Sequence, residues 1–429
     1  MLRHMGTSVD SPLTDSGVLA RAAVYVVVLS AAYYYTLTFV QLGVTEVAME
    51  RLGLSMELVA VAMGLLAAVT LVVTLGSGWA MDRFGWGRTP QHKFRLLFGL
   101  LLLQVGVTVA LTAVSSFTGL LLWIVACSVP LGVAIPFAFS LLLDLVAPAW
   151  RGYAAGVVAG CAFLLAVFLP FEWTVGSFVP AAVTVLAPVV LLLGVLSVSP
   201  GVLGAGVTRA VGVDRPQFDQ HSRVELLDVL TVPALVGLVL LFGAFFVDSL
   251  GFVRIVETPA YVDSSWQSPD YGTRLAIGGT HVAGGLAAGF VYARAGSLWL
   301  FAASFALFGT AQCLYVYDIV AGGPAALGLG TPLVYVLAVS CYTTVTFALW
   351  PDLATRATVG RYTAVGVGVG GWLATFTSTG LALLSDRRGL ALELHLLVAG
   401  SVSVGFLVLT ASLWYLTAVP TKQPPRLRR

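Results

Sequence analysis

The chain has 429 residues, of which 59% are hydrophobic and only 10% are charged, and its mean hydropathy is +0.96. Soluble proteins carry about 25% charged residues, so this composition excludes a water-soluble fold and predicts that lipid covers much of the surface. The apolar runs do not alternate with polar residues, which excludes an outer-membrane β-barrel. The formal net charge of +2 excludes little, but the positions of the charged residues along the chain are informative.

Twelve apolar segments are long enough to cross a bilayer, because a membrane-spanning helix needs about 20 residues. They predict an all-α, polytopic membrane protein whose twelve transmembrane helices form two pseudo-symmetric six-helix bundles. We assign the first bundle to 1–198, a cytoplasmic interdomain loop to 199–229, the second bundle to 230–416 and a basic cytoplasmic tail to 417–429. The predicted spans are roughly 20–48, 56–80, 94–115, 118–146, 153–172, 175–197, 230–257, 273–293, 297–317, 328–350, 361–384 and 391–416.

The Lys and Arg residues predict which side of the membrane each connection faces. If the N-terminus is cytoplasmic, 17 of these residues fall on the cytoplasmic side and 5 fall outside. Cytoplasmic connections carry an excess of Lys and Arg, so we expect a cell-membrane protein with both termini in the cytoplasm. An odd number of spans would destroy this partition, which supports the count of twelve.

Two short motifs recur in the second half of the chain at nearly one offset. The connection between spans two and three contains G-x-x-x-D-R-x-G, and its glycines and arginine recur 211 residues later. RGYAAG at Arg151 matches RYTAVG at Arg361, 210 residues apart. The repetition predicts two parallel structural repeats. The residues of the first motif are Gly78, Asp82, Arg83, Gly85 and Arg88, with Gly289, Arg294 and Gly296 in its second copy.

The charges of these connections have two interpretations. They can simply anchor the topology at the water boundary, which is the interpretation we favour for Lys93 and Arg95. Alternatively, Asp82 accepts backbone N–H groups at the positively polarised N-terminus of a neighbouring helix, in a contact that forms in one arrangement of the bundles and breaks in another. Arg151 and Arg361 would then belong to the same conformational switch.

These residues resemble the signature of the major facilitator superfamily of secondary transporters, which reads G-x-L-A-D-R-x-G-R-K between spans two and three. The chain departs from it at Trp86 and Gly87, where two basic residues are usual, and Ser128 stands where many proton-coupled members carry an arginine. The resemblance implies alternating access between two halves, with a solute site near the midplane among spans 1, 4, 7 and 10.

Polar side chains in spans one and ten are candidates for that site. Tyr34, Thr38 and Gln41 share one face of a helix that turns by about 100° per residue, and span ten contains Tyr342 and Thr343. Hydroxyl groups and aromatic rings suit a sugar-like, amphipathic or aromatic solute. The same hydroxyl groups can instead bond neighbouring backbone inside the bundle.

Ionisable residues inside the spans are rarer and costlier. Asp248 in span seven needs a partner, a proton or water. Glu46 and Glu257 lie 211 residues apart at the outer ends of spans one and seven, where they either form an outer gate or are simply exposed. His281 in span eight is either a hydrogen-bonded core residue or a proton-coupling group.

The sequence favours a secondary active transporter of a small solute. It contains no metal-ligand, nucleotide-binding or hydrolase motif, so we expect no enzyme activity, no cofactor, no metal and no nucleic-acid partner. The expected partners are a small-molecule solute, a proton or sodium as the coupling ion, and the lipid bilayer around a monomer. The alternatives are a substrate sensor with a transporter fold and a facilitative uniporter or channel-like protein.

Overall fold

The computed structural model describes residues 16–170, 172–203, 229, 231–256, 258–265, 267–322 and 328–418. These ranges contain no strand, and twelve of their helical segments are long and apolar enough to cross a membrane. The predicted all-α fold with twelve spans is confirmed. Glu257, the central connection over 204–228 and the tail over 419–429 lie outside the described residues, so the expectations for them stay predictions.

The first half contains six spans. The first span starts as α1 (Ser16–Thr38) and continues as the π-helical segment η2 (Phe39–Arg51). The other five are α2 (Met56–Phe84), α3 (Pro90–Ala110), α4 (Phe117–Leu145), α5 (Arg151–Phe168) and α6 (Val175–Val198). Three 3₁₀ turns follow α3, α4 and α6, namely η3 (Leu111–Ala113), η4 (Pro148–Trp150) and η5 (Pro200–Leu203).

The second half also contains six spans. Five of them are α8 (Val232–Val256), α10 (Tyr271–Ala295), α11 (Ser297–Val320), α12 (Gly330–Leu353) and α15 (Leu392–Ala418). The remaining span joins α13 (Val359–Val367), the π-helical segment η7 (Gly368–Leu373) and α14 (Ala374–Arg387). A short helix, α9 (Pro259–Val262), lies in the connection between α8 and α10.

Local sequence signals determine where several spans begin and end. α2 ends at Gly85, whose φ of +66° is left-handed and costs a glycine little. Pro90 occupies the first turn of α3, where a missing N–H leaves no helical bond unmade. Asp270 caps α10 by accepting the backbone N–H of Thr273 at 2.7 Å. This bond stabilises the charged carboxylate and so lowers the pKa of Asp270 below its ordinary value.

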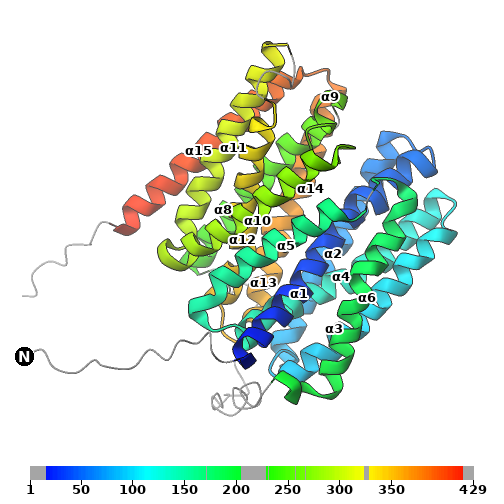
Figure 1. Cartoon of the computed structure of the whole chain (residues 1–429), viewed down its shortest axis with the longest axis vertical. Helices are drawn as coiled ribbons and strands as arrows, with labels where there is room; N and C mark the ends of the chain where they lie inside the picture. Colours follow the sequence, from blue (N-terminus) through cyan, green and yellow to red (C-terminus); the bar gives the residue numbers. More distant parts are fainter. Residues whose placement is uncertain are drawn as a thin grey trace, which may run out of the picture.

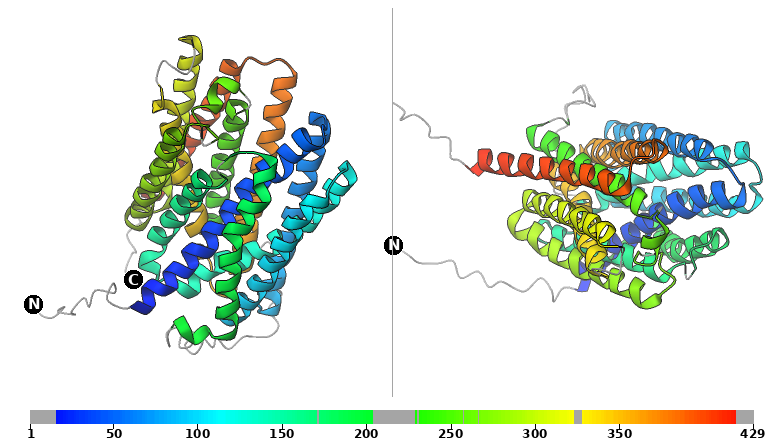
Figure 2. Two further views of the ribbon diagram at one scale, coloured as in Figure 1. Left: turned by 45° about the vertical axis from the view of Figure 1, so that its right-hand side comes forward. Right: turned by 90° about the horizontal axis from the view of Figure 1, so that it is seen from above.

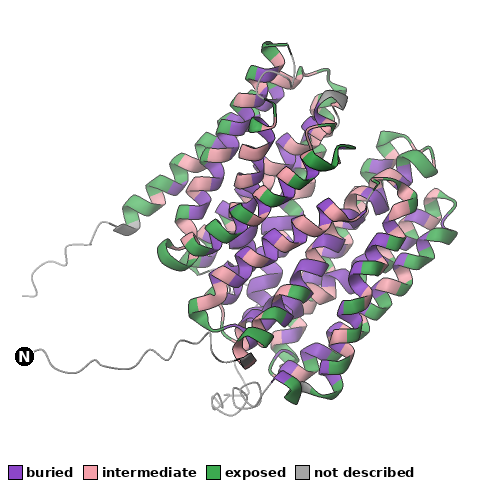
Figure 3. Ribbon diagram, in the orientation of Figure 1, coloured by how far each residue is buried: buried purple, intermediate pink, exposed green. Residues whose placement is uncertain are grey.

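The two halves stand side by side, the first coloured blue to green and the second green to red (Figure 1, Figure 2). Burial is greatest where the halves meet, and exposed positions gather on the outer helices (Figure 3). In the most apolar window of α12, 78% of the residues are buried, against 28% in α3 and α15. α12 is therefore a central helix, whereas α3 and α15 present apolar side chains outward, as helices that face lipid do.

Two helix pairs join the halves by close backbone contact, α2 with α13 and α5 with α10. A Cβ atom on Gly360 would stand 2.5 Å from the Gly78 carbonyl oxygen, and one on Gly289 would stand 2.7 Å from the Gly152 carbonyl oxygen. Only glycine permits backbones to approach this closely. The recurring glycines of the sequence therefore pack the two halves together.

We distinguish two ends of the molecule. The motif end carries the connections α2–α3, α4–α5, α10–α11 and α12–α13, and includes Asp82, Arg151 and Arg361. The cavity end carries the connections α8–α10 and α14–α15 and the turn between η2 and α2, and includes Glu46 and Met56.

Candidate functional site

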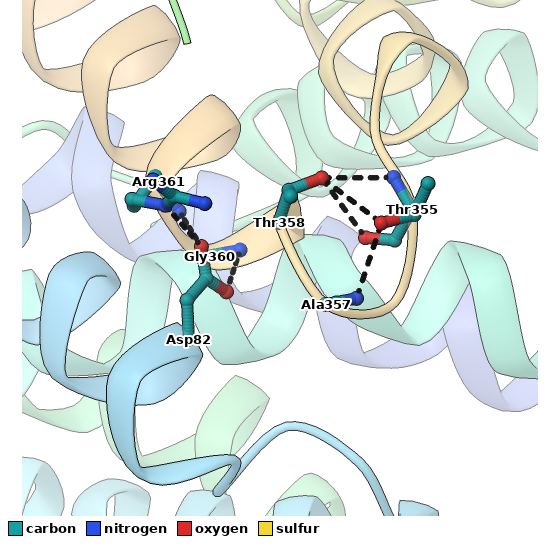
Figure 4. Close-up of polar contacts among 6 residues, drawn as sticks. All are labelled: Asp82, Thr355, Ala357, Thr358, Gly360 and Arg361. Atoms are coloured by element: carbon teal, nitrogen blue, oxygen red, sulfur yellow. Dashed lines mark hydrogen bonds and ion pairs between the residues drawn. The ribbon is translucent and has the colours of Figure 1, made fainter. Parts of the chain in front are cut away.

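Asp82, near the end of α2, links the two halves at the motif end (Figure 4). Its Oδ1 accepts the backbone N–H of Gly360 at 2.9 Å, and its Oδ2 accepts the backbone N–H of Arg361 at 2.9 Å. The Nε–H of Arg361 also donates to Oδ2, at 3.1 Å. Both residues lie in the first turn of α13, whose N–H groups have no partner within the helix. The carboxylate therefore caps α13 from the opposite half, an arrangement that the sequence analysis had considered.

The turn before α13 presents these N–H groups to Asp82. Thr358 Oγ1 accepts the backbone N–H of Thr355 at 3.0 Å, and Thr355 Oγ1 accepts that of Ala357 at 3.3 Å (Figure 4). A Cβ atom on Gly360 would stand 2.7 Å from Asp82 Oδ1, so a side chain there would displace the carboxylate. The sequence analysis missed Gly360, although its position directly before Arg361 was a signal for a helix start.

Two further ion pairs cross between the halves at the motif end. Arg151 Nη1, at the start of α5, lies 2.8 Å from Asp352 Oδ1 at the end of α12, and the Tyr292 hydroxyl donates to Asp352 Oδ2 at 3.0 Å. Asp144 Oδ1, at the end of α4, lies 3.3 Å from Arg356 Nε. Each half thus contributes a carboxylate that an arginine of the other half neutralises.

Lys93 does more than anchor the topology, contrary to the interpretation from sequence. Its side chain is fully buried, and its Nζ lies 2.6 Å from Asp144 Oδ2. The ammonium group therefore holds the buried carboxylate from within the first half, while Arg356 contacts it from the second. Arg95, in contrast, donates from Nε to the Ser197 carbonyl oxygen at 3.2 Å, between α3 and the end of α6.

The other motif residues have three different surroundings. They are the glycines that pack against the opposite half (Gly78, Gly289), the glycines that follow a helix end with positive φ (Gly85, Gly296) and the exposed arginines (Arg83, Arg88, Arg294). The Arg294 guanidinium lies 5.3 Å from the centre of the Phe290 ring. Arg151 and Arg361, the remaining predicted arginines, contact the opposite half.

A cavity of about 630 Å³ lies between the halves and extends to the cavity end. Helices α1, α2, α4 and α5 line it from the first half, and α8, α10, α11, α12 and α14 line it from the second. Met49 and Met56 at its rim are each 37% exposed. Its walls are mostly aliphatic and aromatic, and its volume falls in the range of roughly 300–1,000 Å³ that is usual for ligand pockets.

Asp248 of α8 is a cavity-lining carboxylate held by two tyrosines of α12. The Tyr342 hydroxyl donates to its Oδ2. The Tyr335 hydroxyl lies 2.6 Å from its Oδ1 and 2.7 Å from its backbone oxygen. Among the described residues, no Lys or Arg forms an ion pair with Asp248. The aromatic hydroxyl groups thus meet the need for a partner that the sequence analysis recognised.

His281 of α10 lines the same cavity and is part of a packed cluster. Its ring stacks on Phe163 of α5 with centroids 3.7 Å apart, and its Nδ1 lies 3.0 Å from Ser340 Oγ. Ser340 in turn donates to the Val336 carbonyl oxygen at 2.9 Å. Because that bond uses the single hydroxyl proton, Ser340 accepts from His281, which places a ring proton on Nδ1.

The cavity-facing side of the first span differs from the one predicted. Tyr34 is fully buried and Thr38 donates to the Tyr34 carbonyl oxygen at 3.0 Å, so neither lines the cavity. Gln41, the third candidate, does line it, together with Tyr33. In a helix that is apolar on all sides, the few polar residues do not show from sequence which side faces the cavity. In addition, the change to a π-helix at Phe39 means that 100° per residue no longer relates Gln41 to Tyr34.

The two candidates of span ten have different surroundings. Tyr342 lines the cavity, whereas Thr343 is buried outside it. The sequence analysis missed Tyr335, which lies two helical turns before Tyr342 and therefore on the same face. That spacing was an available signal, but only the packing of α12 against α8 relates both tyrosines to Asp248.

Few polar contacts join the halves at the cavity end. Gln267 donates to Gln41 at 3.1 Å, Arg274 Nη1 donates to the Pro170 carbonyl oxygen at 3.4 Å, and Arg387 Nη2 lies 3.6 Å from Glu57 in an exposed pair. Glu46 lines the cavity near this rim. The described residues contain no group of three or more His, Cys, Asp or Glu side chains that could hold a metal ion.

Comparisons with known proteins identify the fold. No protein-family model and no curated protein matches the sequence. The proton:xylose symporter XylE matches in structure with a TM-score of 0.65 and 13% identity, over 92% of this chain and 95% of that chain. A bacterial homologue of the iron transporter ferroportin in an outward-facing state matches with a TM-score of 0.58 and 14% identity, over 93% and 98%. The chain has the major facilitator fold.

The major facilitator fold explains the repeated motif. Its two copies occupy corresponding places, at the ends of α2 and α10, in two halves of six spans each. The resemblance indicated by the motif residues is therefore confirmed for the fold.

Proposed function

We propose that this protein is a secondary transporter, in which two halves alternately open a shared cavity to either side of the membrane. One observation carries the proposal: the cavity between the halves extends to the cavity end, while helix ends and ion pairs join the halves at the motif end. The comparisons support it, since the structures that match this fold are described as transporters.

The distribution of basic residues supports a cytoplasmic motif end. The conformation described above is then the outward-facing state. Transport requires the motif-end contacts to break and the cavity end to close. The polar contacts suit this exchange, because they lie at helix ends where water replaces a lost partner at moderate cost. The sparse contacts at the cavity end leave room for the halves to approach there.

Distance measurements between spin labels test the exchange directly. In a variant whose four native cysteines are replaced by serine, one label pair would be placed at the exposed motif-end positions Phe84 and Ala295, and another at Met56 and Arg388. We expect two populations whose motif-end and cavity-end distances change in opposite directions. A single unchanging distance at both ends, in lipid and with the motif-end contacts mutated, would contradict alternating access.

Flux measurements in proteoliposomes then separate the alternatives. Solute uptake that a proton or sodium gradient drives against the solute's own gradient would support secondary active transport. Ion currents without added solute would indicate a channel-like protein instead. Specific ligand binding without flux in either direction would indicate a sensor.

A further inference from the structure

The charged side chains that line the cavity are acidic. Its lining includes the carboxyl groups of Asp248 and Glu46, whereas no Lys or Arg lines it among the described residues. His281 is the only histidine among the described residues that line it, and its Nδ1 donates to Ser340. A cavity lined by carboxyl groups and by no Lys or Arg disfavours anions and attracts cations.

The hydrogen bonds around Asp248 provide a place for one further proton. The Tyr335 oxygen lies 2.7 Å from the Asp248 backbone oxygen and 2.6 Å from Oδ1. Both of these atoms accept, yet a tyrosine hydroxyl carries one proton. A proton on the Asp248 carboxyl satisfies both contacts, because Tyr335 can then donate to the backbone oxygen and accept from Oδ1. Without that proton, the carboxylate is held by neutral tyrosine hydroxyls alone, and a bound cation would supply the opposite charge.

Aromatic rings surround the carboxyl group. Phe245 meets the ring of Tyr342 edge-on with centroids 4.8 Å apart, and Phe308 lies 5.1 Å from Tyr335 in the same way. Across the cavity, Tyr33 packs edge-on against Phe163 and Phe347 at 5.7 and 5.2 Å. Aromatic faces attract a weakly hydrated cation through their quadrupole and also accept the apolar body that carries it.

We propose that Asp248 binds the positive charge of a lipophilic organic cation, whose apolar body lies against the aromatic walls of the cavity. The same carboxyl group holds a proton when the cation is absent, so that cation binding releases that proton. This inference rests on the proposed transport function and names its substrate class. The acidic lining, the place for a proton on Asp248 and the aromatic walls each support it.

The groups that face Asp248 are uncharged tyrosines. They are Tyr335 and Tyr342 on α12, Tyr315 on α11 beside Tyr335, and Tyr33 on α1. On α8 and the helices packed against it, Arg254 pairs with Asp386 of α14, His395 of α15 contacts Ser385 and the Leu250 carbonyl, and Asp318 of α11 accepts from Thr331. We expect proton exchange at Asp248, and Glu46→Gln tests the other carboxyl group of the cavity.

Binding of tetraphenylphosphonium to the full-length protein in detergent tests the proposal. Tetraphenylborate has the same shape with the opposite charge and serves as the control ligand. We expect the protein to bind the phosphonium at least ten-fold more tightly than the borate. Asp248→Asn should weaken phosphonium binding by a factor of ten or more, whereas Glu46→Gln, which removes the other cavity carboxylate, should weaken it by less than about three-fold.

Proton release provides a second readout that does not need a variant. In weakly buffered solution, phosphonium binding to the unaltered protein should release protons, and binding to Asp248→Asn should release none. Equal affinity for both ions, or unchanged binding and release in the folded Asp248→Asn protein, would overturn the proposal. If that variant does not fold, ion preference and proton release by the unaltered protein decide the matter.

The outcomes also separate this inference from the proposed function. If Asp248→Asn binds the phosphonium normally while the spin-label distances still exchange, the cation site is wrong and alternating access stands. If the phosphonium requires Asp248 but the distances never change, the site stands and transport by alternating access is wrong.

Discussion

The α2–α13 and α5–α10 contacts occupy corresponding places in the two halves, yet different groups hold them. Both depend on glycines whose backbones touch across the interface. The α2–α13 contact adds Asp82, whose side chain is 1% exposed. At the matching position α10 has Ala293, which is exposed. On that side the carboxylate comes instead from Asp352 of α12, and it is 28% exposed.

This difference shows that the repeat preserved the packing of the helices and not their polar chemistry. A carboxylate shielded from water interacts strongly with helix N–H groups and an arginine, whereas one that water reaches interacts weakly. We therefore expect the two contacts to depend equally on their glycines and unequally on their charges. Mutations at the two contacts can test both expectations in the same distance measurement.

The largest effect is expected from a methyl group at the glycine contacts. A Cβ atom on Gly156 would overlap the Gly285 carbonyl oxygen, and one on Gly78 would overlap that of Gly360. Because neither backbone can yield locally, Gly156→Ala and Gly78→Ala should each disfavour the closed motif end by about 3 kcal/mol or more, roughly 100-fold in population. The Phe84–Ala295 label distance measures the shift.

The same helices offer matched controls for these variants. Gly279 on α10 and Gly64 on α2 are exposed and have open space where a Cβ atom would stand. Gly279→Ala and Gly64→Ala should leave the distances unchanged. A closed motif end that persists in Gly156→Ala would show that backbone contact does not hold the halves together.

The next largest effect is expected from the buried carboxylate. Asp82→Asn keeps the shape of the side chain but removes the charge opposite Arg361 and weakens the bonds to the α13 N-terminus. We expect a loss of about 2 kcal/mol for the closed motif end, roughly 30-fold in population, seen as a longer Phe84–Ala295 distance. Asp386→Asn, at an exposed carboxylate that pairs within its own half, should change this distance little. An equal response to both variants would contradict the assigned role of Asp82.

The smallest effect is expected from the exposed ion pair at the α5–α10 contact. Arg151→Gln removes the charge opposite Asp352, but water already reaches this pair. We expect a change of about 0.5–1 kcal/mol, a two- to five-fold shift that high salt reduces further. Arg294→Gln removes an exposed arginine from the same end and serves as the control. A response to Arg151→Gln as large as that to Asp82→Asn would remove the contrast between the two contacts.

The sequence alone determined the parts of this protein that depend on local composition. Twelve apolar segments had to become twelve spans, because hydropathy and length decide whether a helix enters lipid. Gly78, Asp82 and Arg83 indicated the fold because they match a known signature. The recurrence of the glycine and the arginine 211 residues later indicated two repeated halves. Span one shows the limit of such reasoning: its helical period could not reveal that Tyr33 faces the cavity and Tyr34 does not.

Only the tertiary structure decided which distant groups meet. Asp82 and Gly360 are 278 residues apart, and Asp248 and Tyr342 are 94 apart. Their hydrogen bonds depend on where glycine contacts and π-helical segments set the helices relative to one another. Apolar burial is non-directional and can be inferred from composition, whereas a hydrogen bond requires its donor and acceptor to lie within about 3 Å in a suitable direction.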